Sequence, residues 1–305
     1  MNHTAPILLF TYKRLDALKK TINALIANEL SSQSNLYIFS DGPKSDKDVA
    51  AVQAVRTYLK TIKGFKNISV EESEANRGLA ESIISGVSKI MKISDHVIVM
   101  EDDLLTTPNF LVFMNKALAE YENQHRVFSI SGYSMNLNQD IKNADETYFL
   151  NRGWSWGWAT WKTRWEAVDW KVKDYDEFKK NKIKRAEFAQ GGSDLNKMLR
   201  LQMNGKLDSW AIRWFYHQFK VNGLTLYPVY SKVYNNGFDH LATHTSGSNS
   251  RYLPLLDETF SQNVSFPKVI KANPNYQAAF LKNMGVKARI RSKMETILQS
   301  KFSRK

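Results

Sequence analysis

The sequence predicts an α/β fold with a Rossmann-like, mostly parallel central sheet flanked by helices. Strand-like apolar runs alternate with helix-length segments along the first hundred residues, and this alternation is typical of βαβ units. Polar and acidic residues directly follow several of these runs, at the position where open α/β sheets bind their ligands. The chain has 305 residues, enough for one large α/β domain or two smaller ones.

The elements of the first part follow in order from local patterns. Short apolar runs predict buried strands at residues 6–12, 36–43, 67–72 and 96–100. Between them, apolar residues recur on one helical face and predict helices at 14–30, 48–62 and 75–92. Asp-Gly-Pro ends the second strand, because this tripeptide cannot continue it.

The second part changes character. Its expected elements are a helix at 108–122, strands at 126–134 and 146–151, a charged helix-prone stretch at 171–206, a helix at 208–223 and a late strand at 224–237. All eight tryptophans lie between residues 154 and 214. Trp154, Trp156 and Trp158 alternate with small residues, so we expect them on one face of an extended segment. Such indoles fill cores, bind sugar rings or stack on nucleic-acid bases.

Composition narrows the class of protein. The absence of cysteine excludes disulfides, zinc–thiolate sites and thiol nucleophiles. No charged leader precedes the short apolar run at the N-terminus, so a cytoplasmic protein is expected. The formal net charge of +13 attracts nucleic acid, anionic lipid or phosphate-bearing substrates. Basic and aromatic residues are not interleaved and no RNA-binding motif occurs, so we expect no nucleic-acid partner.

The C-terminal segment 286–305 carries seven Lys or Arg residues against one Glu. Its apolar residues fall at helical spacing: Val286, Ile290, Met294, Ile297, Leu298 and Phe302. A basic amphipathic helix of this kind suits the surface of an anionic membrane, here the inner membrane face. The alternative is a terminal helix that packs on its own domain and exposes a solvated basic face.

Three carboxylates, Glu101, Asp102 and Asp103, directly follow the strand-like run HVIVM. Oxygen ligands of this kind bind Mg²⁺ or Mn²⁺ together with substrate phosphates. Neither G-x-G-x-x-G nor G-x-x-x-x-G-K-[ST] follows the first strand, which counts against a Rossmann dehydrogenase or a P-loop nucleotidase. A metal at this strand end could replace the missing loop as the phosphate clamp; the alternative is a solvated turn.

Two further residues are candidates for chemistry. His244, preferred over His240, could complete a metal site from a distant loop, or could be an ordinary surface histidine. Asp208 precedes a helix, where it could cap the helix or act as a general base toward an acceptor hydroxyl.

The order of these motifs resembles the GT-A superfamily of nucleotide-sugar glycosyltransferases. It is most similar to bacterial transferases of surface-polysaccharide synthesis that carry an SWGWATWK-like segment and a GF-x-x-x-x-TH-like loop. The shared features are TYKR after the first strand, SDG after the second, NRG before a helix, strand-EDD, SWGWATW, DSW and a late His. The resemblance covers roughly residues 4–250. It implies a GT-A domain with a nucleotide-sugar-binding half at 1–105, an acceptor-binding and catalytic half at 106–250, and a C-terminal extension at 251–305.

The resemblance also implies roles for single residues. The expected donor-binding residues are Thr11, Tyr12, Arg14, Asp41, Arg77, Glu101 and Asp102, with Asp41 meeting the base, typically uracil. Asp103 and His244 would bind Mn²⁺ or Mg²⁺. Trp156, Gly157, Trp158 and Trp210 would shape the donor-sugar and acceptor pocket, and Asp208 would be the base of an inverting enzyme. The family's usual DxD motif begins with Asp, whereas this one begins with Glu101.

The sequence thus favours a metal-dependent, inverting hexosyl- or N-acetylhexosaminyltransferase. It would move a sugar from a nucleoside-diphosphate donor to a glycan or lipid-linked acceptor. Two other classes compete. A metal-dependent sugar nucleotidyltransferase would usually carry a Gly-rich basic loop after the first strand, and TYKRLD lacks the glycines. A non-catalytic carbohydrate- or nucleic-acid-binding module would need only the tryptophans and the basic charge.

Overall fold

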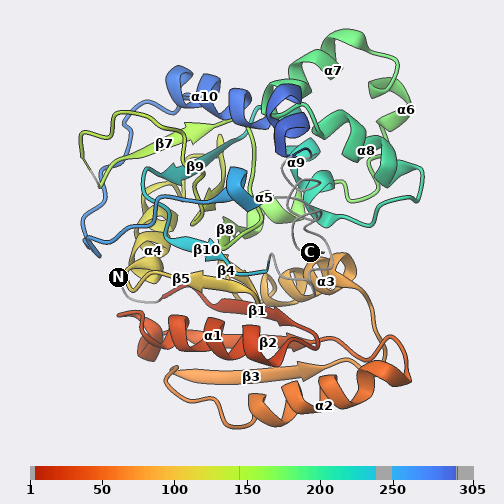
Figure 1. Ribbon diagram of the computed structural model, residues 1–305, viewed down its shortest axis with the longest axis vertical. Coiled ribbons are helices and arrows are strands. Elements are labelled where there is room, and N and C mark those ends of the chain that lie inside the picture. Colours follow the sequence, from red (N-terminus) through yellow and green to blue (C-terminus); the bar gives the residue numbers. More distant parts are fainter. Residues whose placement is uncertain (1–3, 144, 238–248, 293, 295–305) are drawn as a thin grey trace, which may run out of the picture.

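The computed structural model describes residues 4–143, 145–237, 249–292 and 294. An eight-stranded sheet runs through it in the order β3-β2-β1-β4-β8-β6-β9-β7 (Figure 1). Strands β3, β2, β1 and β4 are parallel, while β8 and β7 run against their neighbours. The strands are β1 (Ile7–Thr11), β2 (Asn35–Ser40), β3 (Asn67–Glu72), β4 (His96–Glu101), β6 (Val127–Ser131), β7 (Thr147–Leu150), β8 (Trp158–Trp161) and β9 (Leu224–Pro228). The predicted mostly parallel α/β sheet is confirmed.

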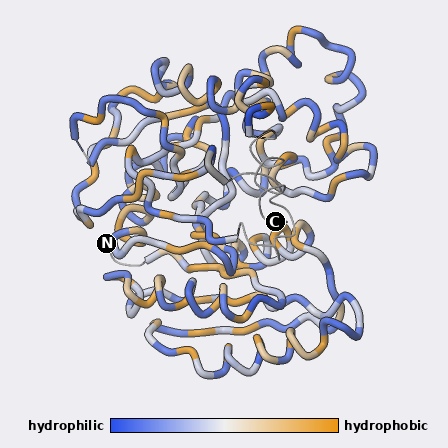
Figure 2. The backbone as a smooth tube through the Cα atoms, in the orientation of Figure 1, coloured by the Kyte–Doolittle hydropathy of each residue, from blue (hydrophilic) through white to orange (hydrophobic). Residues whose placement is uncertain are grey.

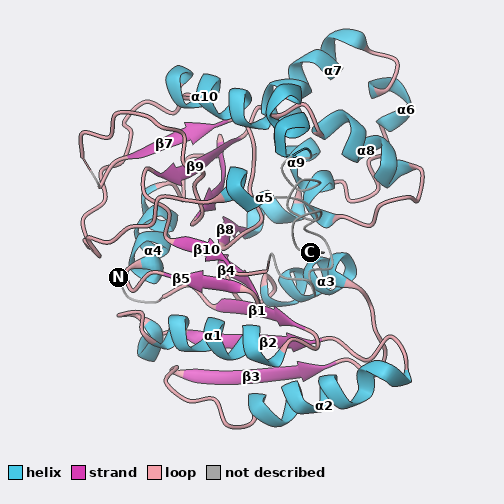
Figure 3. Cartoon of the chain, viewed as in Figure 1, coloured by secondary structure: helices cyan, strands magenta, loops and turns pink. Residues whose placement is uncertain are grey.

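Helices lie on both faces of this sheet (Figure 3). They are α1 (Leu15–Ile26), α2 (Asp46–Leu59), α3 (Leu79–Ile90), α4 (Phe110–Glu120), α5 (Lys162–Glu166), α6 (Tyr175–Phe178), α7 (Lys182–Phe188), α8 (Leu195–Met203), α9 (Trp210–Lys220) and α10 (Pro274–Met284). The expected helices at 14–30, 75–92, 108–122 and 208–223 each contain one of them, and α2 begins two residues before the range expected at 48–62. The charged stretch 171–206 forms α6, α7 and α8.

Alternation along the strands divides the core into two layers, because successive side chains of a strand point to opposite faces. Ile7 and Leu9 of β1 face a layer that includes residues of α1, α2, α4 and α10. Leu8 and Phe10 face the other layer, which includes residues of α3, α8 and α9. Figure 2 shows hydrophobic colour along the central strands, consistent with a sheet buried on both faces.

The late part of the chain differs from its prediction. The single strand expected at 224–237 is divided into β9 and β10 (Val233–Asn235). Strand β10 pairs antiparallel with β5 (Leu104–Thr106) in a separate two-stranded sheet, and neither β5 nor β8 was among the expected strands. Asn235 lies opposite Leu104, so β10 brings the residues after it to the acidic triplet.

The described part of the C-terminal segment is helical over residues 286–292. Val286, Ile290 and Met294 are each more than half exposed, and they therefore form an apolar stripe facing solvent. Residues 295–305 lie outside the described part, so the rest of the expected amphipathic pattern is not tested. Within the described residues, no helix combines the length and the apolar character needed to cross a membrane.

Candidate active site

The carboxyl ends of β1, β2 and β4 lie side by side. Strand β1 pairs with β2 on one side, Thr11 opposite Ser40, and with β4 on the other, Phe10 opposite Glu101. The residues that follow these strands therefore meet at one edge of the sheet. This is the edge at which the sequence placed the donor-binding residues.

Asp102 is fixed by groups at the end of β1. Its Oδ2 accepts hydrogen bonds from the Thr11 hydroxyl at 2.8 Å and from the Tyr12 backbone N–H at 3.1 Å. Its backbone carbonyl accepts a further bond from the Thr21 hydroxyl of α1. Burial, and next the charge of Asp103, raise the pKa of Asp102 to about 6 although the two hydrogen bonds oppose this. Asp102 therefore links the carboxyl end of β4 to that of β1.

Asp103 is held from two other directions. Its Oδ2 lies 2.8 Å from Nη1 of Arg14, and both side chains are mostly buried. On the other side the chain passes close by at Gly237, where a Cβ atom would stand 2.0 Å from the same oxygen. A residue with a Cβ atom would require the carboxylate or the loop to move. The Asn236 N–H donates to the Asp103 carbonyl at 2.8 Å, which fixes the loop after β10 against the triplet.

Glu101 completes the triplet. Burial, then the charges of Asp103 and Asp102, raise its pKa well above the usual value. The charge of Asp103 raises the pKa values of both Glu101 and Asp102; a cation would offset this repulsion, and hard divalent ions prefer such oxygen donors. The described residues contain no group of three His, Cys, Asp or Glu side chains that could hold a metal. The donor set fits a Mg²⁺- or Mn²⁺-type ion that takes most of its ligands from substrate phosphates and water.

Asp41 holds the turn that leads into α3. Its carboxylate accepts bonds from the backbone N–H groups of Gly42, Arg77 and Gly78 and from the Asn76 side-chain amide, at 2.8–3.0 Å. Gly78 has φ +78° at the start of α3, a conformation that favours glycine. Four donors occupy the acceptor positions of one carboxylate. A nucleotide base could reach Asp41 only by displacing one of them, and base recognition there stays a prediction.

Tyr12 has a partner that the sequence did not indicate. Its hydroxyl donates to Asp48 of α2 at 2.9 Å, and Lys13 makes an ion pair with the same carboxylate. Asp48 lies in the charged first turn of α2 and does not follow a strand, so no local sequence pattern indicates this contact. Asp48 therefore holds both the Tyr12 hydroxyl and the charge of Lys13.

The tryptophans do not share one face, contrary to expectation. Gly157 has φ +60°, which breaks the extended alternation between Trp156 and Trp158. Trp154 and Trp156 contact each other and Tyr133 on one side of the sheet. Trp158 belongs to the other layer, where it stacks on Trp210 at 4.9 Å. The expected pocket residues Trp158 and Trp210 are therefore core side chains, which can shape a pocket only through their neighbours.

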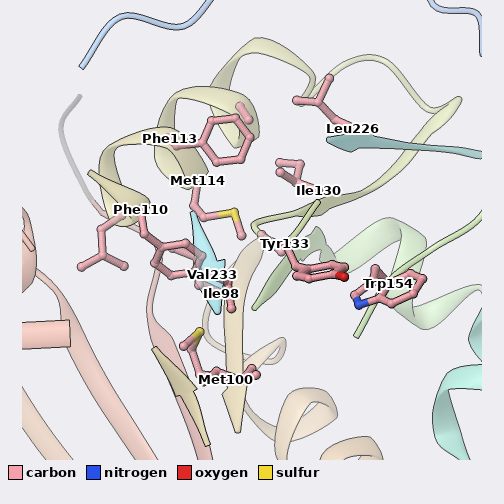
Figure 4. Packing of buried hydrophobic residues seen from close by; sticks show 14 of the residues in the cluster. Ile98, Met100, Phe110, Phe113, Met114, Ile130, Tyr133, Trp154, Leu226 and Val233 are labelled. Carbon is pink, nitrogen blue, oxygen red and sulfur yellow. The ribbon is translucent and has the colours of Figure 1, made fainter. Parts of the chain in front are cut away.

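Gly157 nevertheless brings the SWGW segment to the triplet. Strand β8 pairs antiparallel with β4, with Trp158 opposite Val99. A Cβ at Gly157 would stand 2.8 Å from Val233 and 3.3 Å from the Met100 sulfur, next to Glu101. Figure 4 shows Met100 and Val233 in this packed cluster with Phe110 of α4. Half-buried Trp156 directly precedes Gly157 and packs against the edge of this core.

Asp208 lies near the carboxyl ends of the same strands. The cap of α9 is Ser209, whose hydroxyl accepts from the Ile212 N–H, so the alternative that Asp208 caps this helix is wrong. The Asp208 side chain is 69% exposed, and its Oδ1 lies 3.6 Å from Arg213. Its Oδ2 would stand 3.8 Å from a Cβ at Gly78, at the start of α3. Asp208 therefore faces the turn that Asp41 organises.

Two residues that contact side chains of the candidate site were not predicted from the sequence. Gly237 could have been found only as the glycine after Asn-Asn at a strand end, and Arg213 stands one turn into α9 with no motif of its own. His244 lies outside the described residues.

Comparison with known proteins gives a family match. The family described as Glycosyl transferase family 2 matches residues 7–183. A search of curated proteins finds no match. The similar solved structures include a mannosyltransferase from Pyrobaculum calidifontis in complex with GDP-Man and Mn²⁺, at 12% identity and a TM-score of 0.37, covering 52% of this chain and 45% of that one. They also include TarS from S. aureus, at 13% identity and a TM-score of 0.37, covering 55% and 30%. The match thus spans less than half of either solved chain.

Proposed function

Because the chain belongs to glycosyl transferase family 2, we propose that it is a metal-dependent, inverting glycosyltransferase. It moves a hexosyl or N-acetylhexosaminyl group from a nucleoside-diphosphate donor, preferably a UDP-sugar, to a hydroxyl of a glycan or lipid-linked acceptor. Its process is surface polysaccharide synthesis. The observation that carries this proposal is the meeting of Asp102 and Asp103 with the end of β1, where both carboxylates are held in place.

The donor occupies the edge formed by β1, β2 and β4. Thr11, Tyr12 and the turn at Arg77 surround the nucleotide, and the acidic triplet faces its diphosphate. A divalent cation held at Asp103 would neutralise the charge that develops on the departing diphosphate. Asp102 keeps β1 and β4 in register and thereby positions Asp103.

The reaction itself needs one base. Asp208 takes the proton from the acceptor hydroxyl while that oxygen bonds to the anomeric carbon from the face opposite the diphosphate. The bond between the anomeric carbon and the diphosphate oxygen breaks, and the nucleoside diphosphate leaves with the electron pair. One displacement inverts the configuration. Exposure of Asp208 supports this role because an acceptor must reach it from solvent.

The acceptor is expected near Trp156. Its ring contacts Tyr252 at 5.7 Å between centroids, and both side chains are half-buried. Flat aromatic faces of this kind bind the apolar C–H faces of sugar rings.

Ligand binding and product configuration test the proposal. Melting curves with UDP, GDP or TDP and their sugars, each with and without Mn²⁺, should show a metal-dependent stabilisation, largest for UDP. NMR of the transferred sugar should then show an anomeric configuration opposite to that of the donor. No stabilisation by any nucleotide would favour a non-catalytic carbohydrate-binding module instead. Release of pyrophosphate from a nucleoside triphosphate would favour a nucleotidyltransferase.

We place the working enzyme at an anionic membrane surface, peripheral and on the cytoplasmic side. The stripe of Val286, Ile290 and Met294 supports this, since these side chains face solvent beside Lys287 and Arg291. Co-sedimentation with vesicles containing anionic phospholipid should exceed that with neutral vesicles. The triple variant Val286→Ser, Ile290→Ser, Met294→Ser should stay in the supernatant while its melting temperature is unchanged. Equal pelleting of variant and parent would contradict the assignment.

A further inference from the structure

The acidic triplet already has a cation beside it, and that cation belongs to the chain. Nη1 of Arg14 lies 2.8 Å from Oδ2 of Asp103, with the two side chains 13% and 19% exposed. A charge-assisted contact at this distance and burial is among the stronger ones in proteins. Removing one partner of a mostly buried pair leaves an uncompensated charge, which is costly.

The contacted oxygen is enclosed. The same Oδ2 that meets Arg14 would be 2.0 Å from a Cβ at Gly237, so the guanidinium and the chain at Gly237 crowd a single carboxylate oxygen. A metal ion approaching Asp103 on this side meets a positive charge where its own coordination position would be. Coulomb repulsion between the two cations therefore opposes metal binding while the pair persists.

Arg14 is placed for this contact by its position at the start of α1. Its backbone carbonyl accepts from Leu18 N–H at 3.0 Å, and its side chain makes no cap bond. The side chain is directed to the end of β4. Its positive charge there partly opposes the rise that burial and Asp103 cause in the pKa of Asp102. The neighbouring cation Lys13 is engaged by Asp48 instead.

We propose that Arg14 is the resident counter-ion of Asp103, and that it yields this carboxylate to a divalent cation when a nucleoside diphosphate binds. This inference rests on the proposed function of the site. The planar guanidinium can exchange a carboxylate for a phosphate because both match its paired N–H groups. The diphosphate therefore supplies Arg14 with a new partner and frees Asp103. Metal and nucleotide bind as coupled ligands, and the coupling is reciprocal.

Binding of Mn²⁺, followed by electron paramagnetic resonance of the free ion, tests the inference without any turnover. In the parent protein Mn²⁺ should bind weakly alone and about tenfold or more tightly with uridine diphosphate, within the usual range of coupling between two sites. Arg14→Met should bind Mn²⁺ about tenfold more tightly without nucleotide, because repulsion is removed, and the further tightening by uridine diphosphate should be smaller than in the parent, because only direct ligation by the phosphates remains.

Three further variants control this experiment. Lys13→Met removes the same charge one residue away and should bind Mn²⁺ as the parent does, with and without nucleotide. Arg14→Lys keeps the charge but loses the planar fork, so its metal affinity without nucleotide should stay close to that of the parent. Asp103→Asn should lose binding under every condition, which shows that the ion measured is the one at Asp103. Melting curves confirm that each variant is folded.

The outcomes separate the two proposals. If the parent binds Mn²⁺ with uridine diphosphate but Arg14→Met shows the same affinities and the same coupling, the inference about Arg14 is wrong and the proposed function stands. If the parent binds no Mn²⁺ even with a nucleoside diphosphate, both fail. Tighter Mn²⁺ binding in Arg14→Met together with reduced coupling supports the inference.

Discussion

The carboxylates after β4 and the carboxylate before α9 carry the same functional group in opposite surroundings. Asp102 and Asp103 are held by hydroxyl, backbone and guanidinium groups, and burial raises the pKa of Asp102. Asp208 is 69% exposed, and among the described residues its ion-pair contact is with Arg213 at 3.6 Å. The difference matches the two tasks proposed for these residues. Groups that hold a donor gain from being fixed before it arrives, whereas a base must meet an acceptor that comes from solvent.

The sharpest test of this comparison replaces one acid from each region. Asp208→Asn should lower turnover by about 10²–10⁴-fold, the usual contribution of a general base, and leave the affinity for UDP and Mn²⁺ unchanged. Asp103→Asn should lose both turnover and metal-dependent nucleotide binding. Calorimetric titration with UDP and Mn²⁺, run beside a transfer assay, distinguishes them. Near-normal turnover in Asp208→Asn would mean that another group is the base.

A smaller effect is expected where the chain touches Asp103. Gly237→Ala would place a Cβ 2.0 Å from the Asp103 Oδ2, so either the carboxylate or the loop must move. A displacement near 1 Å at a reacting centre lowers turnover by about 10²-fold, and we expect a loss of this order. Gly205→Ala controls for a general loss of stability, because its φ of +67° strains alanine while nothing lies within 4 Å of the added Cβ. A loss of activity no larger than that of the control would show that Asp103 tolerates displacement.

The smallest effect concerns pH. The folded pKa of Asp102, about 6, lies above the usual value of about 3.9, so the folded state binds more protons between these values. Stability from this group is complete below about pH 4 and is lost as the pH rises through about 6. The free protein should thus lose less stability between pH 5 and pH 8 when Asp102 is replaced by Asn, which still accepts from Thr11 and Tyr12. Urea unfolding at both pH values measures the free energy of unfolding of parent and variant. An equal loss of stability between pH 5 and pH 8 in the two proteins would mean that another group titrates.

The same contrast explains what could be predicted from the sequence. Strands β1 to β4 and helices α1 to α4 were found because each has an unbroken pattern of its own over five residues or more. Strands β5 and β8 have three and four residues, and they are extended only because distant partners pair with them. No local pattern specifies such pairing.

Residue roles divide along similar lines. Asp102 and Asp103 follow a strong strand, so their meeting with the end of β1 was foreseeable from the direction of parallel strands. The positive φ of Gly157, which separates Trp156 from Trp158, was not visible, since glycine is compatible with either conformation. The cap of α9 shifted by one residue from Asp208 to Ser209, a distance at which two good capping residues in succession cannot be told apart.

The place of β8 has a consequence for how such an enzyme can be divided or recombined. Strand β8 belongs to the second part of the chain, yet it pairs with the edge of β4 that would otherwise have no hydrogen-bonded neighbour. A fragment ending at residue 105 would present Val97, Ile98 and Val99, all fully buried in the intact protein, along an open strand edge. Residues 1–105 are therefore not a unit that can be exchanged alone. Under the proposed function, new donor preferences would arise by substitutions within this part while its partner strand stays in place.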